Sequence, residues 1–101
     1  MAYEMLIGLD VSDQESYARY RAGMTPILER FGGGFGYDLE VAKVLKSPRD
    51  AGINRVFTIH FPSQSIANAF FQDESYREVR AAHFEPAVQA TTIMAAYERS
   101  D

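Results

Sequence analysis

The sequence contains no cysteine, which excludes disulfide bonds, thiolate nucleophiles and zinc-thiolate sites. No apolar run approaches the roughly 20 residues that a membrane-spanning helix needs. The amino-terminal segment Met1–Leu9 lacks the basic region of an export signal. The ten Lys and Arg residues are scattered along a chain of net charge −4, so no basic patch for nucleic acid is indicated. We therefore expect a cytoplasmic protein that binds neither membranes nor nucleic acids.

What the chain has instead is apolar side chains. Its 101 residues predict one domain, 1–101, and 47% of them are hydrophobic. Seven phenylalanines and six tyrosines are difficult to bury in so small a body, so a homodimer is expected.

The first half of the chain predicts a strand, a helix and a second strand. Apolar residues alternate from Tyr3 to Val11, and Ser12–Glu15 matches a capping box at the start of a helix. A helical stripe with a buried face follows: Tyr17, Tyr20, Met24, Ile27, Leu28 and Phe31.

Proline and glycine divide the next part of the chain. Pro26 predicts a kink or a break in the helix after Met24, and Gly32–Gly34 predicts its end. A strand over residues 35–45 is expected next, followed by a long connection over residues 46–54.

The second half repeats this order of elements. The β-branched and aromatic run Arg55–Phe61 predicts a strand, and Ser63 can cap the helix that follows it. Two helical pieces are expected, 63–71 and 73–83, with Asp73 capping the second and 84–86 ending it. Residues 89–97 are read as a fourth strand, although their alanines would also suit a helix.

This order is β-α-β-β-α-β, which predicts an α+β, ferredoxin-like fold. In that fold a four-stranded antiparallel sheet carries both helices on one face. In the third strand Phe57, Ile59 and Phe61 alternate with Val56, Thr58 and His60, so neither face is wholly polar. The second face is therefore expected to pack against another subunit.

Several elements, in this order and spacing, carry a resemblance to a known family: Tyr17–Tyr20, the helix around Pro26, Phe31–Gly33, and Phe61–Ser63 followed by Ala67, Ala69, Phe70, Ser75 and Tyr76. Over nearly the whole chain they resemble domain-of-unknown-function family 1330. The resemblance implies a dimeric α+β barrel, in which two sheets pack face to face. That superfamily includes cofactor-free monooxygenases, muconolactone isomerases and haem enzymes, so the fold does not choose a reaction. His60 and the segment Phe84–Val88 depart from the family pattern, so a site built from them is less transferable.

The two histidines are the candidate catalytic residues. His60 lies near the end of the predicted strand Arg55–Phe61 and could act as a general base near neutral pH. His83, near a helix end, could pair with it or with Glu85. The alternatives are a packed, hydrogen-bonded His60 and a His83 that favours the negative helix terminus. No closely spaced ligand pair is present, so neither a metal nor a cofactor is predicted.

Tyrosines are the candidate ligand-binding residues. Tyr17, Tyr37 and Tyr76 could orient a small molecule with their hydroxyls and enclose it with their rings, or simply pack in the core. The glycines of 32–36 follow a helix and precede a strand, which is the reverse of a phosphate loop.

Three functions stay open at this point. The first is a cofactor-independent isomerase or monooxygenase acting on a small aromatic or unsaturated acid, with His60 as base. The second is a dimer that binds a small-molecule ligand without chemistry. The third is a structural or interaction module with a filled core.

Overall fold

The computed structural model describes residues 2–100, so Met1 and Asp101, the ends of the predicted domain, lie outside the described part. Its elements in chain order are β1 (Ala2–Val11), α1 (Gln14–Arg30), β2 (Gly34–Glu40), β3 (Arg55–Phe61), α2 (Gln64–Gln72), α3 (Glu74–Val79), a π-helical turn (Arg80–Phe84) and β4 (Val88–Arg99). The strands form one sheet in the order β2-β3-β1-β4, and each neighbouring pair is antiparallel. The predicted ferredoxin-like fold is confirmed.

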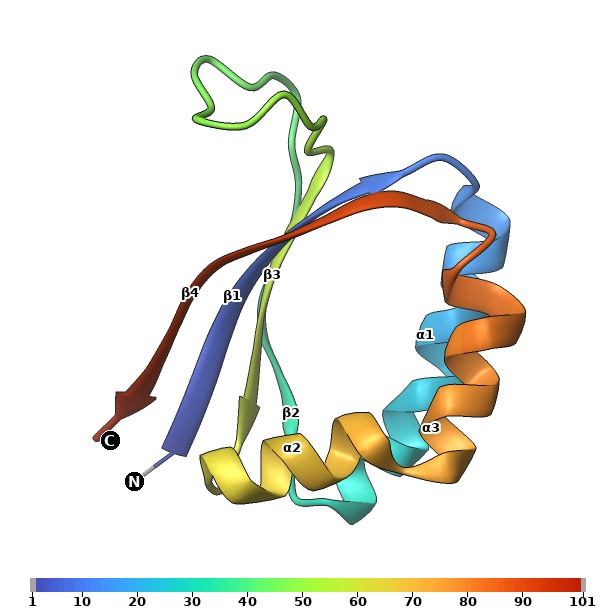
Figure 1. The fold of residues 1–101 in the computed structure, drawn as a ribbon, viewed down its shortest axis with the longest axis vertical. Coiled ribbons are helices and arrows are strands. Elements are labelled where there is room, and N and C mark those ends of the chain that lie inside the picture. The colour runs from blue at the N-terminus through green and yellow to red at the C-terminus, as the bar shows by residue number, and fades with distance from the viewer. Residues whose placement is uncertain (1, 101) are drawn as a thin grey trace.

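All helices cover one face of the sheet, and the other face is bare (Figure 1). Alternation along the strands assigns the side chains to these two faces. Ile7 pairs with Phe57 and both are buried toward the helices, whereas Glu4 pairs with His60 on the other side. We call the uncovered side the outer face, and its central residues are Glu4, Leu6 and Gly8 of β1 with Val56, Thr58 and His60 of β3.

The stripe predicted for the first helix is confirmed, because Tyr17, Tyr20, Met24, Ile27 and Leu28 are all buried. Phe31, its last member, lies just after α1 and is partly buried against the core. The predicted capping box is wrong by one residue. Asp13 caps α1, accepting a hydrogen bond from the Ser16 amide at 3.1 Å, while the Ser12 hydroxyl donates to the Ala87 carbonyl. Ser12 joins two loops, which short-range sequence pattern cannot reveal.

The predicted break at Pro26 is also wrong, because α1 runs without interruption from Gln14 to Arg30. Pro26 removes one ladder hydrogen bond, to the carbonyl of Ala22. Both residues are exposed, so water can solvate that carbonyl. The glycine end is confirmed, with Gly32 in the left-handed region at φ 76°.

The second strand is shorter than predicted. β2 ends at Glu40, which pairs with Arg55, the first residue of β3, so residues beyond Glu40 have no strand opposite them. Residues 41–54 form an arm that projects beyond the end of the sheet (Figure 1). The predicted connection of 46–54 therefore begins five residues too late.

The remaining elements follow the prediction closely. Ser63 caps α2 and Asp73 caps α3 through the amides of Ile66 and Tyr76. The second helical piece differs only in its last turn, which is π-helical. The strand interpretation of the tail is confirmed by β4, which has a bulge where Leu6 pairs with Ala95 but Ile7 pairs with Ile93. None of the helices in the described residues is long and apolar enough to cross a membrane.

Candidate functional site

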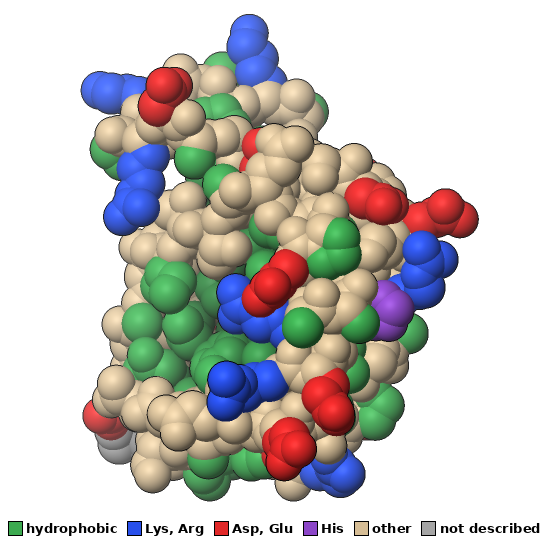
Figure 2. Space-filling view, turned by 45° about the vertical axis from the view of Figure 1, so that its right-hand side comes forward, with side chains coloured by type: hydrophobic (Ala, Val, Ile, Leu, Met, Phe, Trp, Pro, Cys, Tyr) green, Lys and Arg blue, Asp and Glu red, His purple; other side chains and the backbone are tan. Residues whose placement is uncertain are grey.

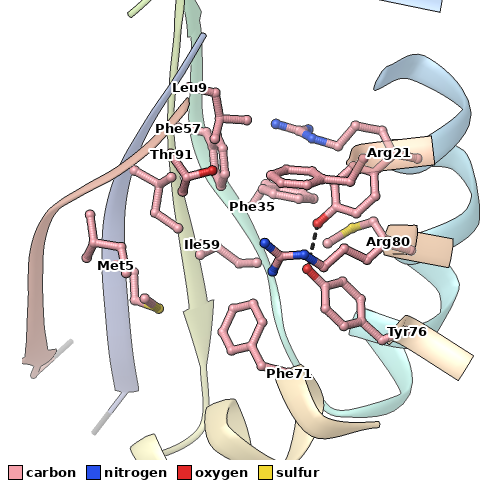
Figure 3. A pocket seen from close by; sticks show the side chains of 15 residues that line it. Met5, Leu9, Arg21, Phe35, Phe57, Ile59, Phe71, Tyr76, Arg80 and Thr91 are labelled. Atoms are coloured by element: carbon pink, nitrogen blue, oxygen red, sulfur yellow. Dashed lines mark hydrogen bonds between the residues drawn. The ribbon is translucent and has the colours of Figure 1, made fainter. Parts of the chain in front are cut away.

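An apolar cavity of about 230 Å³ lies between the sheet and the helices. All four strands of the sheet contribute apolar side chains, among them Met5 of β1, Phe35 of β2 and Ile59 of β3, which point toward the helices (Figure 3). The two-residue period of the strands explains this wall, since alternate residues share one face.

The opposite wall comes from the helical layer. Tyr20 and Met24 of α1, Phe71 of α2 and Tyr76 of α3 face the sheet across the cavity. Two residues of the buried stripe of α1, Tyr20 and Met24, therefore line the cavity as well as packing in the core.

The cavity opens beside β4. Thr91 and Ile93 line it, yet both are exposed, Ile93 to 56%. In Figure 2 hydrophobic side chains surround a hollow that has basic side chains at its rim.

Two tyrosine hydroxyls meet in the helical wall. The Tyr20 and Tyr76 oxygens are 2.9 Å apart, a hydrogen bond drawn as a dashed line in Figure 3. Burial raises the pKa of both phenols, that of Tyr20 well above its ordinary value. Both groups therefore stay protonated near neutral pH, so each keeps an O–H that can donate a hydrogen bond and neither serves as a base.

Arg21 borders one end of the cavity and is held in an ion pair. Its guanidinium is 3.1 Å from Asp38 and lies 3.9 Å above the Phe35 ring. Arg55 binds the same carboxylate at 2.8 Å. The hydrogen bond from Arg55 is the main cause of the lowered pKa of Asp38, and in turn the pKa of Arg55 is raised.

Arg80 begins the π turn, in which the Glu85 amide donates to the Arg80 carbonyl at 3.0 Å. Its guanidinium reaches the cavity (Figure 3). It lies 4.7 Å from the centre of the Phe84 ring. Its positive charge opposes part of the rise in the pKa of Tyr20 and Tyr76, because it favours their anionic forms. π turns are rare and are frequent at functional sites.

Comparison with protein families decides the identity. Residues 2–97 match the family model described as a domain of unknown function, DUF1330. The chain belongs to this family. The comparison with curated proteins found no match.

Solved structures share the fold of this DUF1330 protein. A protein of unknown function from Rhodopseudomonas palustris is 23% identical with a TM-score of 0.80, the match covering 99% of this chain and 83% of that one. A dabb family protein with a ferredoxin-like fold from Mesorhizobium loti is 14% identical, with a TM-score of 0.66 and coverage of 99% and 98%. SnoaB from Streptomyces nogalater, a cofactor-independent oxygenase, is 9% identical, with a TM-score of 0.59 and coverage of 99% and 92%. At these identities the likeness extends to the fold alone.

The structure separates the predicted ligand-binding tyrosines. Tyr76 lines the cavity. Tyr17 is buried beside it, where its hydroxyl accepts a hydrogen bond from Arg21 at 2.8 Å. Tyr37 lies in the irregular stretch of β2 between Phe35 and Asp38 and is 73% exposed.

The two predicted catalytic histidines lie on different sides of the sheet. His60 is on the outer face, opposite Glu4 and beside Gly34, and is not among the residues that line the cavity. His83 lies in the π turn of the helical layer, where its carbonyl accepts a hydrogen bond from the Ser16 hydroxyl. The structure does not bring them together, and their catalytic roles stay predictions.

Sequence reasoning missed the arginines of the cavity. Tyr76, Arg80 and Phe84 are spaced four residues apart, which places them on one side of a helical segment. This spacing could have indicated Arg80 as a candidate site residue, because a basic residue between two aromatic residues on a buried helical stripe is unusual.

Proposed function

We propose that this DUF1330 protein binds a small apolar molecule in the cavity between sheet and helices. The observation that carries the proposal is the apolar space of about 230 Å³ that opens beside β4. An engineered apolar cavity of about 150 Å³ binds benzene, so by proportion this one suits a ligand of about ten non-hydrogen atoms. A module with a filled core would have no such space.

Binding is better supported than catalysis. Among the described residues that line the cavity there is no carboxylate and no histidine, and the tyrosines are held protonated by burial. Proton abstraction from a bound substrate would need a base that this lining does not offer. The enzymatic alternative is cofactor-independent chemistry of the kind named for SnoaB, with His60 and His83 as the predicted catalytic residues.

The proposal includes a homodimer formed through the outer face of the sheet. No helix covers this face (Figure 1), and Leu39 pairs there with Val56 while remaining 51% exposed. Met94 and Tyr97 of β4 are also large, apolar and exposed. A second copy would bury these side chains, which single small domains rarely leave in water. We also retain the cytoplasmic location as a prediction, which rests on the absence of cysteine.

Indole, a neutral molecule of suitable size, is the first probe. We expect it to raise the melting temperature of the wild type, because a ligand that binds only the folded state stabilises it. Ile59→Trp places a large ring in the cavity and is expected to weaken indole binding about tenfold or more, equivalent to about 1.4 kcal/mol. Its matched control is His60→Trp, one residue along the same strand but on the outer face, which should bind indole as the wild type does.

The outcomes separate the hypotheses. If neither indole nor similar small apolar molecules shift the wild type, the binding proposal fails. If His60→Trp loses binding and Ile59→Trp keeps it, the ligand site lies on the outer face instead. The dimer is tested by sedimentation of the wild type and of Leu39→Lys, which should sediment as a monomer at concentrations where the wild type is a dimer.

A further inference from the structure

We infer that the ligand of this cavity is an apolar carboxylic acid whose carboxylate binds to the guanidinium of Arg80. The inference rests on the proposed function and adds the chemical class of the ligand and the residue that selects it.

The charge of the cavity is positive. Arg21 and Arg80 are its charged residues, and the described lining residues include no acid. This arrangement is unexpected in a chain whose net charge is −4. The charges that meet the apolar space are therefore of one sign, and they favour an anion.

Arg21 does not supply a free binding group. Its guanidinium is paired with Asp38 and stacked on Phe35. Because Arg55 shares the same carboxylate, these three side chains together carry a net charge of +1. They add to the positive potential at one end of the cavity but leave direct recognition to the other arginine.

Arg80 lies over the Phe84 ring and beside the Tyr76 hydroxyl, but among the described residues it has no carboxylate partner. It is half-buried, and within residues 2–100 no carboxylate lies within ion-pair distance of its guanidinium. The nearby glutamates Glu74, Glu78 and Glu85 are exposed and line a second surface pocket, to which Arg80 also contributes. A charge that faces an apolar wall without a counterion is costly, and an anionic ligand would remove that cost.

The tyrosine pair supplies a second donor beside the guanidinium. In the hydrogen bond between Tyr20 and Tyr76 one hydroxyl donates to the other, which leaves the O–H of the acceptor free. The raised pKa values keep both protons in place. A carboxylate at Arg80 can thus accept hydrogen bonds from a planar guanidinium fork and from a phenol.

The remaining space fits the apolar part of such an acid. The Phe84 ring lies beside Arg80 and Tyr20, and the Phe71 ring lies beside Tyr76. Ile59 and Met5 face the helices from the sheet (Figure 3). A single guanidinium without a carboxylate partner suits one carboxylate. A small arylalkanoic acid of about ten non-hydrogen atoms matches both the charge and the volume, scaled from the benzene-binding cavity.

Phenylacetate and its methyl ester are the probes, because they differ mainly in charge. Their affinities for the wild type are measured by calorimetry at pH 7, where the acid is ionised. We expect phenylacetate to bind at least about tenfold more tightly than the ester. Arg80→Gln should lose this preference while still binding the ester, since the apolar walls are unchanged.

Arg77→Gln is the matched control, because it removes the same charge from an exposed position on α3 that does not line the cavity. It should keep the preference for the acid. Equal binding of acid and ester by the wild type, or a preference that survives in Arg80→Gln, would overturn the inference while the proposed function stands. Failure of both probes, and of indole, would refute the two together.

Discussion

Replacing Tyr76 by phenylalanine tests whether the hydroxyl pair stabilises the wall of the cavity. Tyr20 is 6% exposed, and its hydroxyl bonds to the Tyr76 hydroxyl at 2.9 Å. Tyr76→Phe removes that bond and leaves a buried hydroxyl without its partner. A lost hydrogen bond of about 1 kcal/mol and part of a desolvation penalty of about 1–3 kcal/mol give a destabilisation of about 2 kcal/mol.

Replacing the other tyrosine of the pair should destabilise the protein less. In Tyr20→Phe the Tyr76 hydroxyl still has a polar neighbour, the guanidinium of Arg80, which acts to lower the pKa of Tyr76. We expect a loss of about 1 kcal/mol, and a similar loss in the double variant, in which no hydroxyl is left unpaired. The double-mutant cycle should therefore show a coupling energy of about 2 kcal/mol.

The assay is urea unfolding followed by circular dichroism at one fixed protein concentration, because a dimer makes stability depend on concentration. Melting temperatures offer a second measurement, at about 4–8 °C per kcal/mol for a domain of this size. Additive losses within about 0.5 kcal/mol would mean that the two hydroxyls act independently, and the reasoning would be refuted.

Three further predictions concern the scaffold. Gly33→Ala should destabilise the protein by about 2 kcal/mol, because its Cβ would lie 2.8 Å from the His60 carbonyl oxygen; an unchanged melting temperature would contradict the close approach. Asp38→Asn should cost about 1 kcal/mol, discounted for solvent screening. Hydrogen bonding from Arg55 lowers the pKa of Asp38 in the folded protein. The stability that Asp38 contributes is therefore present above pH ~4 and is lost as the pH falls through the folded pKa. The free energy of unfolding of Asp38→Asn should accordingly fall less steeply with acid than that of the wild type. Ser63→Ala removes the cap of α2 and should cost about 1 kcal/mol in thermal unfolding, whereas no change would show that the cap is dispensable.

Most of the fold could be predicted because its signals are local. The alternation in β3, the glycines after α1 and the caps Ser63 and Asp73 each depend on a few neighbouring residues. The errors arose where distant contacts decide. Ser12 bonds to Ala87, which is far along the chain, and so leaves the cap to Asp13.

The candidate site was harder to predict for the same reason. Strand alternation shows that His60 and Ile59 face opposite ways, but only the helical layer shows which side holds the cavity. The spacing of Tyr76, Arg80 and Phe84 places the three residues on one side of a helical segment, but nothing in it indicates the π turn that begins at Arg80. Tyr76 was predicted as a binding residue, and the structure places it in the lining.

The bulge in β4 has a consequence for the rate at which a ligand could exchange. Among the described strands β4 is an edge strand that pairs with β1 alone, and the extra residue, Met94, directly follows Ile93 at the mouth of the cavity. Widening the mouth there disturbs one ladder of hydrogen bonds at a point where it is already irregular. Entry and departure can then occur by a local opening far less costly than global unfolding. A ligand of this protein should come and go while the rest of the sheet stays closed.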